Sequence, residues 1–185
     1  MRSTSPSWTE RTRAAAALAL VAALAACSTT AERPRGAQVG KPAPEYSAVT
    51  LAGDSASLAG MRGKVVLLNI WATWCAPCRQ EIPVLEALHG RHRAEGLEVV
   101  GVSVDAAGEE QKVRDFAKEW AMSYPLWHDP EERVSTLYLA VGVPASYLID
   151  REGILRWKHI GPVRADDPTL TSALRAALDA KPSGD

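Results

Sequence analysis

Two short apolar runs, each followed by an amphipathic segment, constrain the fold of this chain more than any other feature. Residues 64–71 (KVVLLNIW) and 97–104 (LEVVGVSV) consist almost entirely of apolar residues rich in Val, Leu and Ile, as expected of central strands that are covered on both faces. Apolar residues at helical spacing follow each run, over 77–93 and over 109–122. This alternation predicts an α/β fold with parallel strands at its centre.

The C-terminal part of the chain adds a pair of strands that run in opposite directions. Segments 146–150 and 154–160 flank the sequence DREG at 150–153, a tight connection typical of a hairpin. The sequence Asp-Asp-Pro at 166–168 then supplies a cap and a first-turn proline for a last helix that extends to about residue 180. The central sheet is therefore predicted to be mixed.

The first 26 residues are typical of a secretion signal. Three arginines and a single acidic residue precede a run of Ala, Leu and Val over 14–26, which is too short to cross about 30 Å of hydrocarbon. The run ends directly before Cys27, in a pattern that resembles the lipobox of bacterial lipoproteins. That resemblance implies that Cys27 is lipidated and anchors the protein to a membrane outside the cytoplasm. The alternative is an ordinary signal peptide followed by an idle Cys27 thiol.

Composition divides the chain further and excludes some functions. We expect a signal peptide over 1–26, a tether rich in small and polar residues over 27–44, one folded domain over 45–181 and a flexible tail over 182–185. A formal net charge of -1, without a basic run, argues against nucleic-acid binding. A hydrophobic content of 46% is too high for a disordered chain.

A Cys-x-x-Cys motif lies where the first predicted strand passes into the first predicted helix. Unsatisfied N–H groups and the positive end of the helix dipole favour a thiolate there, and so lower the pKa of Cys75. We therefore expect Cys75 to attack a substrate disulfide, and Cys78, one turn later and more buried, to resolve the mixed disulfide. Pro77 suits the first turn because its missing N–H would have no helical partner.

Other uses of the cysteine pair fit the sequence less well. A zinc site completed by His89 and His92 has a spacing outside the usual finger pattern, and His89 lies 11 residues beyond Cys78, about 16 Å along a continuous helix. A permanent structural disulfide would close a loop too small to restrict the unfolded chain much. Binding of Cu(I) by the two sulfurs stays open as an alternative. The preferred interpretation requires no metal and no cofactor.

The sequence NIWATWCAPCRQEIP at 69–83, together with GVP at 142–144 and LID at 148–150, resembles the TlpA/ResA group of thioredoxin-like proteins. The resemblance covers about residues 40–161. It implies a thioredoxin fold with three α/β/α layers and a mixed central sheet. It also implies that the protein is a membrane-tethered thiol-disulfide oxidoreductase of the bacterial cell envelope. Many members of the group act as reductants in cytochrome c maturation.

The same resemblance implies roles for residues around the motif. Pro144 is expected to form a cis peptide bond facing the cysteines, and Val143 to pair its backbone with an extended substrate. Glu81 is expected to move protons for the buried thiol, and partial burial would raise its pKa; a solvated helix residue is the alternative. Trp74 and Pro77 are expected to contact the substrate. One interpretation is that Trp71 and Trp74 form an aromatic surface beside Cys75, and the other is that Trp71 belongs to the core while Trp74 acts as a lid.

These inferences together predict a lipid-anchored monomer that reduces the disulfides of other proteins. An upstream membrane thiol reductant is required because the compartment is oxidising. The direction of electron flow follows from the resemblance alone, and a thiol oxidase of the same fold is the alternative. A peroxidase is disfavoured because Ala72, instead of Thr, stands three residues before Cys75. The chain departs from the group at two places: Ile70 replaces the commoner Phe, and Ala145-Ser146 stands where two Thr are common. These differences are expected to affect details of the substrate groove.

Overall fold

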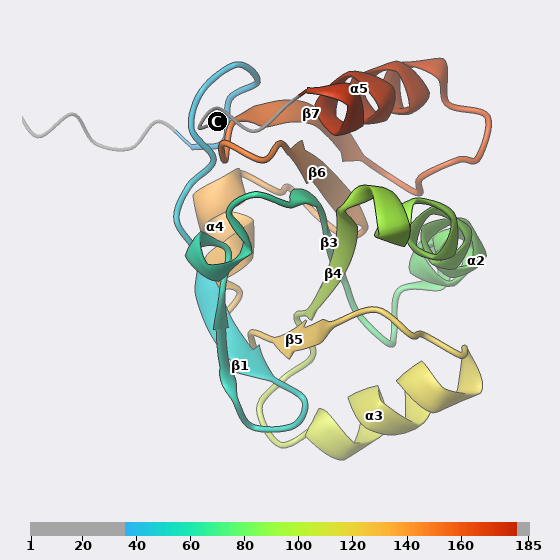
Figure 1. The fold of residues 1–185 in the computed structure, drawn as a ribbon. Coiled ribbons are helices and arrows are strands. Elements are labelled where there is room, and N and C mark those ends of the chain that lie inside the picture. Colours follow the sequence, from blue (N-terminus) through green and yellow to red (C-terminus); the bar gives the residue numbers. More distant parts are fainter. Residues whose placement is uncertain (1–35, 181–185) are drawn as a thin grey trace, which may run out of the picture. The chain divides into compact units, whose positions relative to one another are not determined.

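The computed structural model describes residues 36–180, so the predicted signal peptide, Cys27 and the predicted tail lie outside the described residues. Within that range the chain forms a sheet of seven strands and four α-helices (Figure 1). The strands are β1 (Ser47–Thr50), β2 (Ser55–Ser57), β3 (Val65–Trp71), β4 (Leu97–Ser103), β5 (Leu126–His128), β6 (Ala145–Ile149) and β7 (Leu155–Ile160). The helices are α2 (Ala76–His92), α3 (Glu110–Glu119), α4 (Arg133–Tyr138) and α5 (Pro168–Asp179), with two 3-10 turns, η1 (Ala59–Met61) and η2 (Arg93–Glu95). None of these helices is long and apolar enough to cross a membrane.

The sheet is mixed, as predicted. Its strands lie in the order β2-β1-β5-β4-β3-β6-β7. The β3, β4 and β5 strands are parallel to one another, whereas β6 and β7 form the predicted antiparallel pair beside β3. Every residue of β3 is buried, which agrees with the continuous apolar run of its sequence. The strand that leads to the cysteine motif therefore lies at the centre of the fold.

The helices complete three α/β/α layers. Figure 1 shows α2, α3 and α5 on one side of the sheet and α4 on the other. Successive residues of β3 point to opposite faces: Leu67 belongs to the same buried cluster as Leu85 of α2 and Leu174 of α5, whereas Leu68 belongs to a cluster with Tyr138 of α4. Both faces of the central strand are thus covered by apolar side chains.

The segment before β1 corrects the predicted boundary at residue 45. Ala37 is 1% exposed, and Leu155 at the start of β7 donates its N–H to the carbonyl of Lys41 at 2.9 Å. Part of the segment predicted as tether, 27–44, is therefore packed on the folded domain. Its mixture of Pro, Gly and small residues gave no periodic signal of that contact.

Candidate active site

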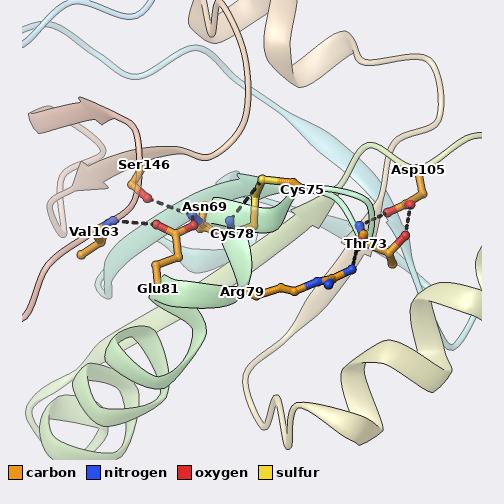
Figure 2. Close-up of a disulfide and its surroundings, with 9 residues drawn as sticks. All are labelled: Asn69, Thr73, Cys75, Cys78, Arg79, Glu81, Asp105, Ser146 and Val163. Carbon is orange, nitrogen blue, oxygen red and sulfur yellow. Dashed lines mark hydrogen bonds between the residues drawn. A yellow bond between two sulfur atoms is a disulfide. The ribbon is translucent and has the colours of Figure 1, made fainter.

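The cysteine motif lies at the junction between β3 and α2, as predicted. Cys75 is the N-cap residue of α2 with an extended backbone (φ -84°, ψ 103°), and a proline occupies the first turn. Cys75 and Cys78 form a disulfide (Figure 2) with their Cα atoms 5.3 Å apart. Because Cys75 caps the helix and Cys78 lies within its first turn, the rigid helix end fixes both sulfurs.

The two sulfurs differ in their surroundings. The backbone N–H of Cys78 donates to Sγ of Cys75 at 3.2 Å, so the helix end directs a hydrogen-bond donor at the first sulfur. The same donor would stabilise a Cys75 thiolate once the disulfide is reduced. Cys75 is 4% exposed and Cys78 is fully buried. This asymmetry suits attack at Cys75 and resolution from the interior by Cys78.

A buried carboxyl group lies on the inner side of α2, one turn beyond Cys78. Glu81 is 1% exposed and accepts hydrogen bonds from Nδ2 of Asn69 at 2.8 Å and from the N–H of Val163 at 2.7 Å (Figure 2). Asn69 also donates to Oγ of Ser146 at 3.0 Å. Glu81 is therefore a buried group, and the alternative of a solvated helix residue is wrong.

Burial sets the titration of this carboxyl group. Removal from water raises the pKa of Glu81 from 4.5 to about 7, because desolvation outweighs the two hydrogen bonds, which lower it. A group with a pKa near neutrality takes up and releases protons readily at physiological pH. The arrangement thus places a carboxyl group that titrates near neutrality on α2, one turn beyond Cys78.

Glu81 is expected to make the folded state less stable as the pH rises. Because the pKa of Glu81 is raised on folding, its full contribution to the free energy of unfolding is present below about pH 4.5. That contribution is lost as the pH rises through about 7. The loss at pH 8 amounts to roughly 3 kcal/mol. Urea unfolding at pH 5 and pH 8 tests this: a Glu81→Gln variant should gain stability relative to the wild type between the two values. Identical pH dependence of both proteins would contradict it.

A second polar network lies on the other side of the disulfide (Figure 2). The buried carboxylate of Asp105 accepts hydrogen bonds from the N–H of Thr73, at 3.0 Å, and from its hydroxyl. Nη2 of Arg79 donates to the carbonyl of Thr73 at 3.1 Å. Sequence reasoning missed Thr73 and Asp105. The available signal was an acidic residue placed directly after the buried run 97–104.

The loop before β6 lies beside the motif. The Val143–Pro144 peptide bond is cis, as the family resemblance implied. Ile70 of β3 pairs with Ala145 of β6 in antiparallel register. Pro144, the residue before Ala145, therefore lies near the end of β3 that leads to Cys75. Pro144 is buried and Val143 is half-buried. The backbone before β6 and the cysteine motif are thereby brought to the same end of the sheet.

The two tryptophans next to the motif have different environments. Trp71 is 1% exposed, and its ring lies 5.3 Å from the ring of Phe116 in α3. Trp74 is 60% exposed, and the neighbouring Pro77 is also exposed. Trp71 therefore belongs to the core, and Trp74 alone of the two presents an aromatic ring to solvent.

Comparisons with known proteins agree with this site. Residues 39–158 match the AhpC/TSA family. The thioredoxin-like protein YneN of Bacillus subtilis (strain 168) is 38% identical over 134 residues, which span 72% of this chain and 78% of that protein. The thiol-disulfide oxidoreductase ResA of Bacillus cereus is 34% identical over 124 residues, covering 67% of this chain and 70% of that protein.

A solved structure shows the same fold. A protein from Chlorobium tepidum, assigned as the thiol:disulfide interchange protein DsbE, superimposes with a TM-score of 0.71 at 32% identity, covering 77% of this chain and 99% of that chain. The predicted thioredoxin fold and the predicted enzyme class are both confirmed. With its helix-capping disulfide and these relatives, the chain belongs to the AhpC/TSA family of thioredoxin-fold proteins and is a thiol-disulfide oxidoreductase.

Proposed function

We propose that this protein reduces disulfides in other proteins through the Cys75/Cys78 pair. The Cys75 thiolate attacks one sulfur of the substrate disulfide, which forms a mixed disulfide and releases the first substrate thiol. The Cys78 thiolate then attacks Sγ of Cys75, which closes the Cys75–Cys78 disulfide and releases the second thiol. Two electrons pass from the pair to the substrate. The observation that carries the proposal is the disulfide at the N-terminus of α2, with Cys78 N–H directed at Sγ of Cys75.

The substrate is proposed to bind across the exposed surface beside Cys75. Trp74, 60% exposed, and the exposed Pro77 supply apolar contact area on one side. The backbone of Val143, next to Pro144, supplies hydrogen-bonding groups for an extended substrate segment on the other. An extended protein chain fits such a site better than a small disulfide because it uses both sides at once.

Glu81 is proposed to exchange a proton with Cys78. The second step requires a Cys78 thiolate, and this fully buried thiol has no exposed surface from which water can take the proton. A carboxylate one turn along the same helix, with a pKa of about 7, is suited to accept that proton. The bound proton returns when an upstream reductant opens the disulfide again.

The protein is proposed to act outside the cytoplasm, lipid-anchored through Cys27 and as a monomer. Support comes from the apolar run 14–26 and the small residues before Cys27. A membrane thiol reductant would then restore the dithiol, and cytochrome c maturation is the process in which the reduced pair would be used. Replacement of Cys27 by Ser is expected to release the protein from the membrane fraction, and unchanged membrane association would contradict the anchor.

The reduction potential of the Cys75/Cys78 pair tests the proposed direction of electron flow. Pairs of this kind range from about -270 mV in thioredoxin to about -120 mV in a strong oxidant. Equilibration with glutathione buffers, followed by quantification of the two redox forms, should give a value near the reducing end of this range. A value near -120 mV would identify the protein as a thiol oxidase.

A further inference from the structure

We propose that Asp105 is a positioning residue for disulfide exchange, which acts by fixing the backbone that presents Trp74 and Cys75. This inference rests on the proposed function and adds a residue to it. Asp105 lies two residues beyond the end of β4, on the side of the disulfide opposite Glu81 (Figure 2). It has no direct contact with either sulfur among the interactions of the described residues. Its effect on the reaction therefore passes through Thr73.

The carboxylate of Asp105 is fully buried and fully engaged. Its Oδ2 accepts the N–H of Thr73 at 3.0 Å and the hydroxyl of Ser103 at 2.7 Å, and its Oδ1 accepts the hydroxyl of Thr73. Nζ of Lys112, half exposed, lies 3.9 Å from Oδ1. The backbone carbonyl of Asp105 contacts Nε2 of His128 at 2.9 Å. A buried carboxylate with this many charge-assisted hydrogen bonds holds its donors in fixed places.

Thr73 is held by all three of its polar groups. Its N–H and hydroxyl donate to Asp105, and its carbonyl accepts from Nη2 of Arg79 at 3.1 Å. The guanidinium of Arg79 is itself held 5.8 Å from the centre of the Phe116 ring. Thr73 is 3% exposed, whereas the next residue, Trp74, is 60% exposed. The Trp74 ring has little packing to fix it, so its position depends on the backbone at Thr73, which also leads into Cys75 at the helix N-terminus.

This arrangement affects protein substrates more than small ones. A protein disulfide must align with Cys75 while the surrounding chain contacts Trp74, and displacement of a reacting group by about 1 Å can lower a rate by about 10²-fold. A small disulfide needs only access to the sulfur. We therefore expect Asp105→Ala to slow exchange with a protein disulfide by about 10-fold to 100-fold, and exchange with oxidised dithiothreitol by less than about threefold.

Two further variants separate positioning from charge and from folding. Asparagine at position 105 can accept the Thr73 and Ser103 bonds through its oxygen and donate to the Thr73 hydroxyl through its nitrogen, so Asp105→Asn should restore the rate to within about threefold of the wild type. Thr73→Val removes only the hydroxyl bond, which provides a milder test if Asp105→Ala fails to fold. Thr73→Val should slow exchange with the protein disulfide by a smaller factor than Asp105→Ala does.

Asp129 provides a matched control. It is 1% exposed and lies just after β5, as Asp105 lies just beyond β4 with one residue between, but its carboxylate accepts the N–H of Val134 at 2.7 Å at the start of α4. Asp129→Ala thus removes an equally buried carboxylate from the opposite side of the sheet. It should lower stability and leave the ratio of protein to small-disulfide rates unchanged.

The decisive experiment measures both exchange rates and the backbone order parameters of residues 73–75 by ¹⁵N relaxation. Asp105→Ala should lower these order parameters from about 0.85 toward 0.6. The same variant should lose exchange with the protein disulfide while it keeps exchange with oxidised dithiothreitol. Unchanged order parameters, an equal loss with both disulfides, or the same selective loss in Asp129→Ala would overturn the inference. If the wild type exchanges no protein disulfides, the proposed function fails, while the order parameters still decide whether Asp105 fixes this backbone.

Discussion

Replacement of Cys75 by Ser is expected to lower the rate of protein-disulfide reduction on the order of 10³-fold or more, because the attacking thiolate is removed. A hydroxyl at the same helix end stays protonated at neutral pH and is not a nucleophile toward sulfur. Insulin reduction with dithiothreitol as electron source measures the rate. A Cys27→Ser variant is the control, because it removes a cysteine outside the Cys-x-x-Cys motif and should leave the rate unchanged.

The Cys78→Ser variant should give a different result from Cys75→Ser. The backbone N–H of residue 78 still donates to Sγ of Cys75 in this variant, so the first attack still occurs. The mixed disulfide is not resolved, because the second thiol is missing. Mass spectrometry should therefore show a substrate covalently attached at residue 75. Attachment of substrate at residue 78 in a Cys75→Ser protein, with none at residue 75 in the Cys78→Ser protein, would reverse the assigned roles.

Replacement of Glu81 by Gln is expected to lower the rate of mixed-disulfide resolution by about 10²-fold at pH 7, since proton transfer by a positioned side chain typically contributes at least this factor. In the proposed role of Glu81, its carboxylate form accepts the Cys78 proton. In the wild type the rate should therefore rise with pH through an inflection near 7, the pKa that burial gives Glu81. The Gln variant should lack that inflection.

Stopped-flow measurement of resolution between pH 5 and pH 9 tests this expectation. Glu86→Gln is a matched control on the same helix, because Glu86 accepts a hydrogen bond from the hydroxyl of Ser123 at 2.8 Å and has no contact with Asn69 or Cys78 among the described interactions. It should preserve the inflection. A Glu81→Gln protein with the wild-type profile would remove Glu81 from the reaction.

The central elements of the fold could be predicted because their sequences carry strong periodic signals. The runs 64–71 and 97–104 became β3 and β4, and the helical spacing over 77–93 became α2. The helix predicted over 109–122 ends at Glu119, because Ala121 turns the backbone to a φ of +50°. Long apolar patterns thus identified the elements, while a local backbone conformation decided where one of them stops.

The unpredicted elements are short and depend on tertiary contacts. The β1, β2 and β5 strands have four, three and three residues, and α4 has six. None is long enough to show a reliable period. The β5 strand is stabilised by pairing with β4 and β1, and α4 packs through Tyr138, whose ring lies 4.9 Å from that of Tyr147 in β6. Such contacts are absent from any single window of sequence.

The candidate site was predictable where chemistry is local. Cys75, Cys78 and the helix end lie within a few residues of one another, and the family resemblance added Pro144 and Glu81. Thr73 and Asp105 are separated by 32 residues, and the Val163 N–H that binds Glu81 comes from 82 residues away. Pairings at such separations arise from the three-dimensional fold, so the acidic residue after the run 97–104 was a signal for Asp105 itself but not for its partner.

The pH dependence of Cys75 alkylation in the reduced protein tests the central claim most directly, because a redox pair at a helix N-terminus requires a stabilised thiolate. Peptide mapping after brief treatment with iodoacetamide follows each cysteine separately. We predict that Cys75 reacts with a midpoint well below about pH 8.5, the value of an unperturbed thiol, while Cys78 stays protected. A Cys75 midpoint at or above 8.5, or faster labelling of Cys78, would contradict the account.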